Sequence, residues 1–307
     1  MKAILVGAVE STLVALHAIA AAPDWELAAV LTLPSANADR HSDFVDLAIP
    51  AERAGARVFH TSNINADATL ALIAEIAPDH IFVIGSSQLC RERFLASAPL
   101  GVIGYHPAPL PRLRGRGVIP WTILLGEPIT AGTLFRIDMG TDSGPILAQR
   151  FFHVAADETA ARLYAAHMTV LAEMLPGLLE RLARGDRDGV VQDERHATWA
   201  ARRRPSDGRI DWTLPADDIW RLVRACGDPY PGAWTTVDGE HLVIAAASPV
   251  SATRHHAAIP GQIVARTPDG FTVRCGHQTG LEISGWRWTT LAVPPLHAIL
   301  GQETTKP

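Results

Sequence analysis

The sequence predicts an α/β fold: a Rossmann-like, mostly parallel sheet with helices on both faces, followed by a small, OB-like open β-barrel. Two observations support this prediction. In the first half of the 307-residue chain, short β-rich apolar runs alternate with helical patterns, as in βαβ units. After a polar stretch at residues 202–208, strand-like runs follow one another between turn signals, which is typical of small barrels. We therefore expect one domain over residues 1–203 and a second over residues 204–307.

The first half supplies a regular series of elements. Buried strands are expected at residues 3–6, 27–33, 58–60, 81–84 and 102–105. Shorter helical patterns cover residues 11–21 and 66–76. A long helix is expected over residues 158–184, where leucines form an apolar stripe, Gly185 marks the end, and Pro176 is predicted to kink or split the helix.

The second half predicts one helix and then strands only. The helix is expected over residues 216–225. Strands are expected at residues 233–237, 242–246, 262–266, 271–274 and 281–286. This spacing is what predicts the open barrel.

Composition excludes several classes of function. A net charge of −5 gives no broad basic field for nucleic acid. The three cysteines are far apart in sequence, so we expect no disulfide framework and no metal site, and we predict a cytoplasmic protein. The N-terminal apolar run contains Glu10 and His17, which argues against a signal peptide, and no membrane span is expected.

Two motifs suggest chemistry. His106 lies just past the strand predicted at residues 102–105 and begins a loop rich in proline and arginine, and Asp142 lies in a glycine-bounded turn. A strand-end histidine often bonds only a loop carbonyl, and Asp-Ser-Gly is a common turn, so neither residue means much alone. A histidine held by a carboxylate, however, is a general acid–base pair that works near neutral pH.

Together these motifs resemble the folate-dependent formyltransferases. That family carries Asn-x-His, Leu-Pro-x-x-Arg-Gly and Asp-[Ser/Thr]-Gly; residues 106, 110–115 and 142–144 match, but Gly104 stands where the family has asparagine. Residues 210–212, 224–234 and 260–261 are similar to the family's C-terminal module, so the resemblance covers nearly the whole chain.

The resemblance implies formyl transfer from 10-formyltetrahydrofolate to a primary amine, with His106 and Asp142 as catalytic residues. It also implies cofactor-binding roles for Gln88, Leu89, Cys90, Arg116, Asp138, Met139, Gly140 and Thr141. An imidazole near neutrality can move the proton that leaves the amine and the one that reaches N10 of the folate.

The pattern is most similar to enzymes that formylate amino sugars carried on nucleotides, so a small-molecule amine is the expected partner. A methionyl-tRNA formyltransferase is the first alternative, but the loop at residues 35–46 has three aspartates against Arg40 alone, which disfavours phosphate contacts. The second alternative is a folate-binding or hydrolytic relative of the family, which lost transfer activity together with the asparagine. Gly7 lies in no Gly-x-Gly-x-x-Gly motif, which disfavours a dinucleotide-dependent oxidoreductase. The oligomeric state stays open.

Gly104 carries a prediction of its own. Glycine is required there if its φ is positive or if substrate packs against its backbone, and an asparagine would then clash. We expect Gly104→Asn to reduce formylation. The oxyanion would instead be stabilised by protonated His106, a backbone N–H of residues 104–107, or an ordered water.

Overall fold

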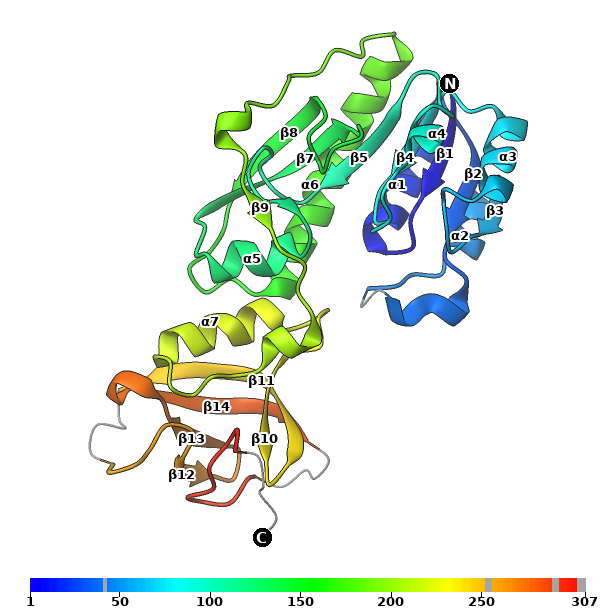
Figure 1. Cartoon of the computed structure of the whole chain (residues 1–307). Coiled ribbons are helices and arrows are strands. Elements are labelled where there is room, and N and C mark those ends of the chain that lie inside the picture. Colours follow the sequence, from blue (N-terminus) through cyan, green and yellow to red (C-terminus); the bar gives the residue numbers. More distant parts are fainter. Residues whose placement is uncertain (41–42, 252–255, 289–292, 303–307) are drawn as a thin grey trace. The chain divides into compact units, whose positions relative to one another are not determined.

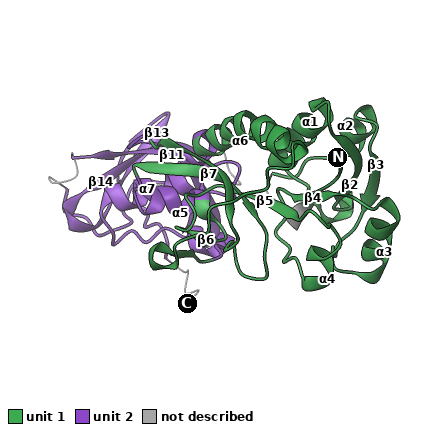
Figure 2. Cartoon of the chain, turned by 90° about the horizontal axis from the view of Figure 1, so that it is seen from above, with its two compact units in different colours: residues 1–118, 128–154, 163–201 green, residues 119–127, 155–162, 202–307 purple. Residues whose placement is uncertain are grey.

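A computed structural model describes residues 1–40, 43–251, 256–288 and 293–302 of the chain (Figure 1). The chain forms two compact units, coloured separately in Figure 2. The first unit contains residues 1–118, 128–154 and 163–201; the second contains residues 119–127, 155–162 and 202–307. The predicted domain boundary after residue 203 stays a prediction.

The first unit is built on a seven-stranded sheet with the order β3-β2-β1-β4-β5-β7-β8. Its strands are β1 (Lys2–Val6), β2 (Glu26–Thr32), β3 (Arg57–His60), β4 (His80–Val83), β5 (Val102–His106), β7 (Ile129–Arg136) and β8 (Ile146–His153). The first five run parallel, and β7 and β8 continue the sheet antiparallel. The predicted fold class, a mostly parallel sheet followed by a β-rich unit, is confirmed.

Helices cover both faces of this sheet. They are α1 (Glu10–Ala21), α2 (Ala48–Arg53), α3 (Asp67–Ile76), α4 (Glu92–Leu95) and α6 (Ala160–Ala183). Helix α5 (Val118–Leu124) belongs to the second unit except for its first residue. Apolar side chains of α1, α2 and α6 share one buried cluster with alternate strand residues such as Leu5 and Phe82. The intervening residues, such as Ile4 and Ile81, face α3 and α4 in a second cluster. The strands are therefore buried on both faces, which explains their continuous apolar runs.

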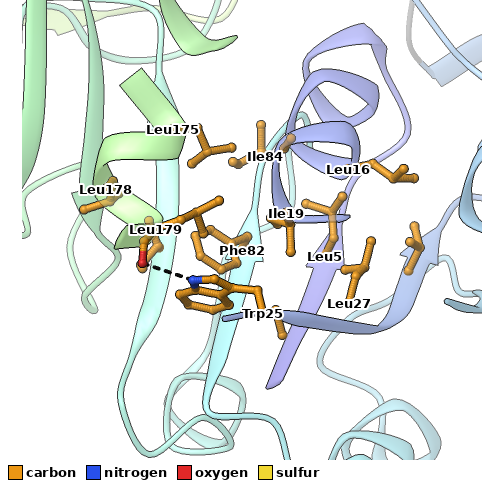
Figure 3. Close-up of a cluster of buried hydrophobic side chains, with 14 of the residues drawn as sticks. Leu5, Leu16, Ile19, Trp25, Leu27, Phe82, Ile84, Leu175, Leu178 and Leu179 are labelled. Carbon is orange, nitrogen blue, oxygen red and sulfur yellow. Dashed lines mark hydrogen bonds between the residues drawn. The ribbon is translucent and has the colours of Figure 1, made fainter. Parts of the chain in front are cut away.

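Helix α6 docks on the sheet through leucines of one stripe (Figure 3). Trp25 packs edge-on against Phe82, and its indole N–H donates to the carbonyl of Leu179 at 3.0 Å. The prediction was that Pro176 kinks or splits this helix. The helix continues through Pro176, so the predicted split is wrong, and the kink stays a prediction. Burial of the stripe outweighs the one backbone hydrogen bond that proline removes.

Strands β7 and β8 were not expected from the sequence. β7 carries Gly132 at its centre, where a side chain would collide with the Tyr105 hydroxyl, and β8 is the edge of the sheet and exposes Phe151. Neither strand therefore shows a continuous apolar run or a clean alternation. Their position matters, because β7 pairs with the strand that ends at His106.

The second unit contains α7 (Ala216–Cys226) and a five-stranded antiparallel sheet with the order β10-β11-β14-β13-β12. Its strands are β10 (Ala233–Val237), β11 (Glu240–Val250), β12 (Ile263–Thr267), β13 (Gly270–Arg274) and β14 (Gly280–Arg287). The two edge strands do not pair within the part of the chain that is described, so the sheet is open. Helix α7 packs Ile219 and Val223 against it. Asp238 and Gly239 both have positive φ and form the tight turn between β10 and β11.

The helices that the structure describes include none that is both long and apolar enough to cross a membrane.

Candidate active site

His106 is the last residue of β5 and is 5% exposed. Its Nε2 lies 2.7 Å from the carbonyl oxygen of Leu113, and its Nδ1 lies 3.7 Å from Oδ2 of Asp142. A carbonyl only accepts hydrogen bonds, so Nε2 must carry the ring hydrogen in neutral His106. This leaves Nδ1 as the free base, with a carboxylate beside it that stabilises the ring once it is protonated.

Asp142 reaches His106 through a tightly held turn. Because β7 runs antiparallel to β5, the loop that follows β7 starts beside Ile103 and must return toward the strand end. Oδ1 of Asp138 accepts from the N–H of Gly140 and from the hydroxyl of Ser143, which closes the turn. Asp142 itself has a φ of 51°, a left-handed conformation that aspartate tolerates better than most residues.

Gly144 allows this return of the chain. A Cβ at position 144 would lie 1.8 Å from the carbonyl oxygen of Arg136, so no other residue fits without moving the backbone. The carboxylate of Asp142 is oriented by the backbone N–H of Gly115, which donates to Oδ2 at 2.8 Å. One oxygen therefore meets both a fixed donor and the imidazole.

The loop after His106 is held by residues 192–200, which sequence reasoning missed. The short strands β6 (Arg114–Gly115) and β9 (Trp199–Ala200) pair in parallel. The hydroxyl of Thr198 accepts from the N–H of Leu113, the residue whose carbonyl fixes His106. No motif marks this segment, because its role depends on contacts across some eighty positions of sequence, such as Leu113 to Thr198.

Arg114 and Gln192 form a buried polar network next to the pair. Arg114 is 3% exposed and makes a bidentate ion pair with Glu194 at 2.7 and 2.9 Å. Its guanidinium also donates to Oε1 of Gln192, and Nε2 of Gln192 donates to the carbonyls of Asp142 and Gly144. The hydrogen bonds from Arg114 lower the pKa of the Glu194 carboxyl.

The predicted cofactor residues lie on loops that contact each other. Arg116 donates to the carbonyl of Ser87, which joins the loop after β5 to the loop after β4. Leu89 and Met139 are 76% and 68% exposed, so two large apolar side chains are available to a ligand. Gly140 and Thr141 are exposed in the same turn as Asp138.

Gln88 and Cys90 are engaged with the protein instead. Oε1 of Gln88 accepts from the N–H of Ile64, and the Cys90 side chain packs on the cluster beneath α4. Burial raises the pKa of the Cys90 thiol to about 12, so this cysteine is not a nucleophile at neutral pH. Their predicted cofactor contacts stay predictions.

A small pocket opens at the carboxyl ends of β1, β2 and β4. Its lining includes Gly7, Thr32, Ser86 and Gln88. The strand order reverses between β1 and β4, and open α/β sheets bind ligands at such a crevice.

Gly104 lies on the same face of β5 as His106, because side chains two apart in a strand share a face. Its φ is outside the left-handed region, so positive φ is not the reason for glycine. A Cβ there would lie 2.9 Å from the ring of Phe135 and 3.0 Å from the side chain of Ile137. Apolar neighbours therefore fill the space that the family's asparagine would need.

The sequence also predicted that the chain has no metal site and that the acidic loop at residues 35–46 does not bind tRNA. Within the described ranges, no three His, Cys, Asp or Glu residues come together as a metal site would require. The acidic loop at residues 35–46 is described only in part, since residues 41 and 42 lie outside those ranges. Its predicted failure to bind tRNA stays a prediction.

Comparison with known families and structures shows what this chain is similar to. The sequence model described as formyl transferase matches residues 2–179, and the model of the formyl transferase C-terminal domain matches residues 203–290. Among solved structures, HypX from Aquifex aeolicus in complex with tetrahydrofolic acid is similar at 19% identity and a TM-score of 0.65, over 94% of this chain. This chain spans only 44% of that HypX chain.

Two N-formyltransferases match over most of their own length. The enzyme from Helicobacter canadensis, in complex with folinic acid and dTDP-3-aminofucose, is 15% identical with a TM-score of 0.65, over 92% of this chain and 99% of that one. A 4-N formyltransferase from Francisella tularensis is 16% identical with a TM-score of 0.60, over 76% and 91%. At these identities the structures establish a shared fold.

Proposed function

Because this chain belongs to the formyl transferase family, we propose that it is an N-formyltransferase that uses 10-formyltetrahydrofolate as formyl donor. The proposed acceptor is a primary amine on a small molecule, such as an amino sugar carried on a nucleotide. The observation that supports this most directly is the buried His106, whose free Nδ1 faces Asp142 while Nε2–H is fixed by a carbonyl.

The reaction needs one base and one acid in succession. The amine attacks the formyl carbon, a new C–N bond forms, and the bond from that carbon to N10 of the folate breaks. The amine nitrogen loses one proton and N10 gains one, so the protons balance. Nδ1 of His106 is suited to take the first and return the second, and Asp142 would stabilise the imidazolium in between.

The donor would lie on the loops that carry Leu89, Arg116 and Met139. A pterin and its aromatic linker are flat, and exposed apolar side chains next to backbone donors and acceptors suit such rings. The folate ligands of the HypX and Helicobacter structures support a folate donor. All three side chains come from loops tied to the His106–Asp142 pair through Gly115 and Ser87.

Stabilisation of the oxyanion is where this chain differs from its family. Gly104 offers no side chain, and Pro107 has no N–H to donate. Protonated Nδ1 of His106, or a water held by the site, would supply the missing hydrogen bond.

A small acceptor fits the charge of the chain better than tRNA does. The net charge is −5, and the second unit has no basic excess large enough to suggest a polyanion from composition. The three cysteines are free in the structure, which suits the cytoplasmic location predicted from the sequence.

Hydrolysis of 10-formyltetrahydrofolate is the second candidate, favoured by the glycine at position 104. In that reaction water would replace the amine, and the same histidine would act as base. Dependence on an amine separates the two reactions.

The test is to incubate the purified chain with 10-formyltetrahydrofolate and a panel of amines that includes nucleotide-linked amino sugars. We expect tetrahydrofolate release only with an acceptor, together with the mass increase of one formyl group on that amine. Release that is independent of any amine would support hydrolysis, and efficient formylation of methionyl-tRNA alone would overturn the small-amine proposal.

A further inference from the structure

Gln192 has every hydrogen-bonding position of its side-chain amide in use, although it lies far from both catalytic motifs in sequence. It is 6% exposed. Its Nε2 donates to the carbonyl of Asp142 at 2.8 Å and to that of Gly144 at 2.7 Å. Its Oε1 accepts from Nε and Nη2 of Arg114 at 3.2 and 2.8 Å. The two hydrogens and two lone pairs of the amide are thus satisfied.

These contacts hold the Asp142 turn through its backbone carbonyls, whereas the carboxylate of Asp142 faces Gly115 and His106. The turn holds Asp142 in a left-handed conformation, which costs energy for a residue with a Cβ and persists only where neighbours enforce it. The side-chain amide of Gln192 donates hydrogen bonds to the carbonyls of Asp142 and Gly144. It therefore fixes the backbone at the left-handed residue and two residues after it.

The other end of the same amide fixes the loop that holds His106. Arg114 lies between Leu113, whose carbonyl accepts from His106, and Gly115, whose N–H orients Asp142. Gln192 therefore connects the two loops that carry the catalytic pair, while its side chain touches neither reacting group.

We propose that Gln192 is a positioning residue that sets the distance between Asp142 and His106. This inference rests on the proposed function in one respect, because the expected loss of turnover requires the proposed reaction. Its structural part, the orientation of the Asp142 carboxylate by the amide, can be measured without any substrate.

Two variants separate the donor and acceptor sides of the amide. Gln192→Leu removes both, whereas Gln192→Glu keeps an acceptor for Arg114 but loses the donor to the two carbonyls. We expect kcat to fall about 10- to 100-fold in both, because a small misplacement of catalytic groups has that effect, while KM for the donor changes less than about threefold. The Glu variant retains the partner of Arg114 and should fold even if the Leu variant does not.

Hydrogen exchange of the Gly115 amide provides the second readout. That N–H bonds Oδ2 of Asp142, so its protection reports whether the carboxylate is in place. We expect exchange at Gly115 to be at least about tenfold faster in Gln192→Glu than in wild type.

Trp25→Phe is the control for simple loss of stability. It removes another buried hydrogen bond of the first unit, from the indole to the carbonyl of Leu179 (Figure 3). The aromatic neighbours of Trp25 are His80 and Phe82 of β4. Its kcat should stay within about twofold of wild type, as expected for independent sites. Unchanged kcat together with unchanged Gly115 exchange in Gln192→Glu would overturn the proposal. If wild type transfers no formyl group but Gly115 loses protection, the proposed function fails and the positioning role stands.

Discussion

His106 has one defined role because its ring nitrogens face different partners. The carbonyl of Leu113 requires a hydrogen on Nε2, which leaves the lone pair of Nδ1 on the side of the Asp142 carboxylate. The 3.7 Å separation is longer than a hydrogen bond, and such contacts often tighten only when substrate binds. The alternative considered from sequence, a strand-end histidine bonded to a loop carbonyl, is also true of this residue, and that bond is what leaves Nδ1 free.

Gly104→Asn tests the departure from the family at the residue scale. The new Cβ would crowd Phe135 and Ile137, and a polar amide would enter an apolar surrounding. We expect the free energy of unfolding to fall by about 1–3 kcal/mol, which is typical of overpacking, and amine formylation to fall with it. Urea denaturation and the tetrahydrofolate release assay measure the two effects.

Gly55→Asn is a matched control for that change. A Cβ at position 55 meets no atom of the described residues within 4 Å, and asparagine tolerates the positive φ found there. It should leave activity unchanged, while Phe135→Leu added to Gly104→Asn should recover part of the lost stability by making room. A Gly104→Asn enzyme that formylates the native amine faster than wild type would instead identify the wild-type site as a degraded form of the family's.

At the scale of elements, helix α6 brings a buried histidine against the back of β5. His167 is 0% exposed, and the Tyr105 hydroxyl lies 3.2 Å from its Nδ1 and 3.1 Å from its backbone carbonyl. Burial, together with the charge of His106, lowers the pKa of His167 to about 3. Burial also raises the pKa of Tyr105. Both side chains are therefore neutral at pH 7, and α6 packs on the strand that ends at His106 without adding charge.

His167 should make stability depend on pH. Its ordinary pKa is 6.5, so between about pH 6.5 and 3 the unfolded chain binds a proton that the folded chain does not. Stability should therefore fall as pH decreases through that window. His167→Leu removes this proton, and the Tyr105 hydroxyl keeps the backbone carbonyl as acceptor. Urea unfolding from pH 8 to pH 4.5 should show a shallower decline for the variant.

The same series includes an internal check at high pH. Nε2 of His167 is buried and has no hydrogen-bond partner among the residues that the structure describes, so replacing the ring by an apolar side chain should cost little at pH 8. His17→Leu, at an exposed position of α1, should follow the wild-type curve. Parallel curves for wild type and His167→Leu would show that His167 is not buried in its neutral form.

In the first unit, sequence predicted the parallel strands and α6 because their apolar residues contact the core. Strands β1 and β4 are buried along almost their whole length, and even the partly exposed β3 contributes Val58 and Phe59 to the two clusters. Strand β8 was missed because it is a half-exposed edge, and β7 because Gly132 makes room for Tyr105. Predicting α6 as continuous would have required knowledge of the sheet that its leucines contact.

At the scale of the whole molecule, the sequence could single out His106 and Asp142 because a family motif marks each residue, and the structure places Nδ1 of the histidine 3.7 Å from Oδ2 of the aspartate. Their catalytic role stays a prediction. The role of residues 192–200 could not be predicted, because no local sequence pattern around Gln192 or Thr198 indicates their contacts. Residues 119–127 and 155–162 belong to the second unit although they interrupt the first in sequence.

The central claim is that His106 and Asp142 together catalyse formyl transfer. The most direct measurement is amine-dependent release of tetrahydrofolate by wild type, His106→Ala and Asp142→Asn, with urea unfolding to verify that each variant folds. Removing a general acid–base group typically costs about 10²–10⁴-fold, and we expect kcat to fall within that range in both variants with wild-type-like unfolding midpoints. Near-native turnover by a folded His106→Ala enzyme would contradict the account.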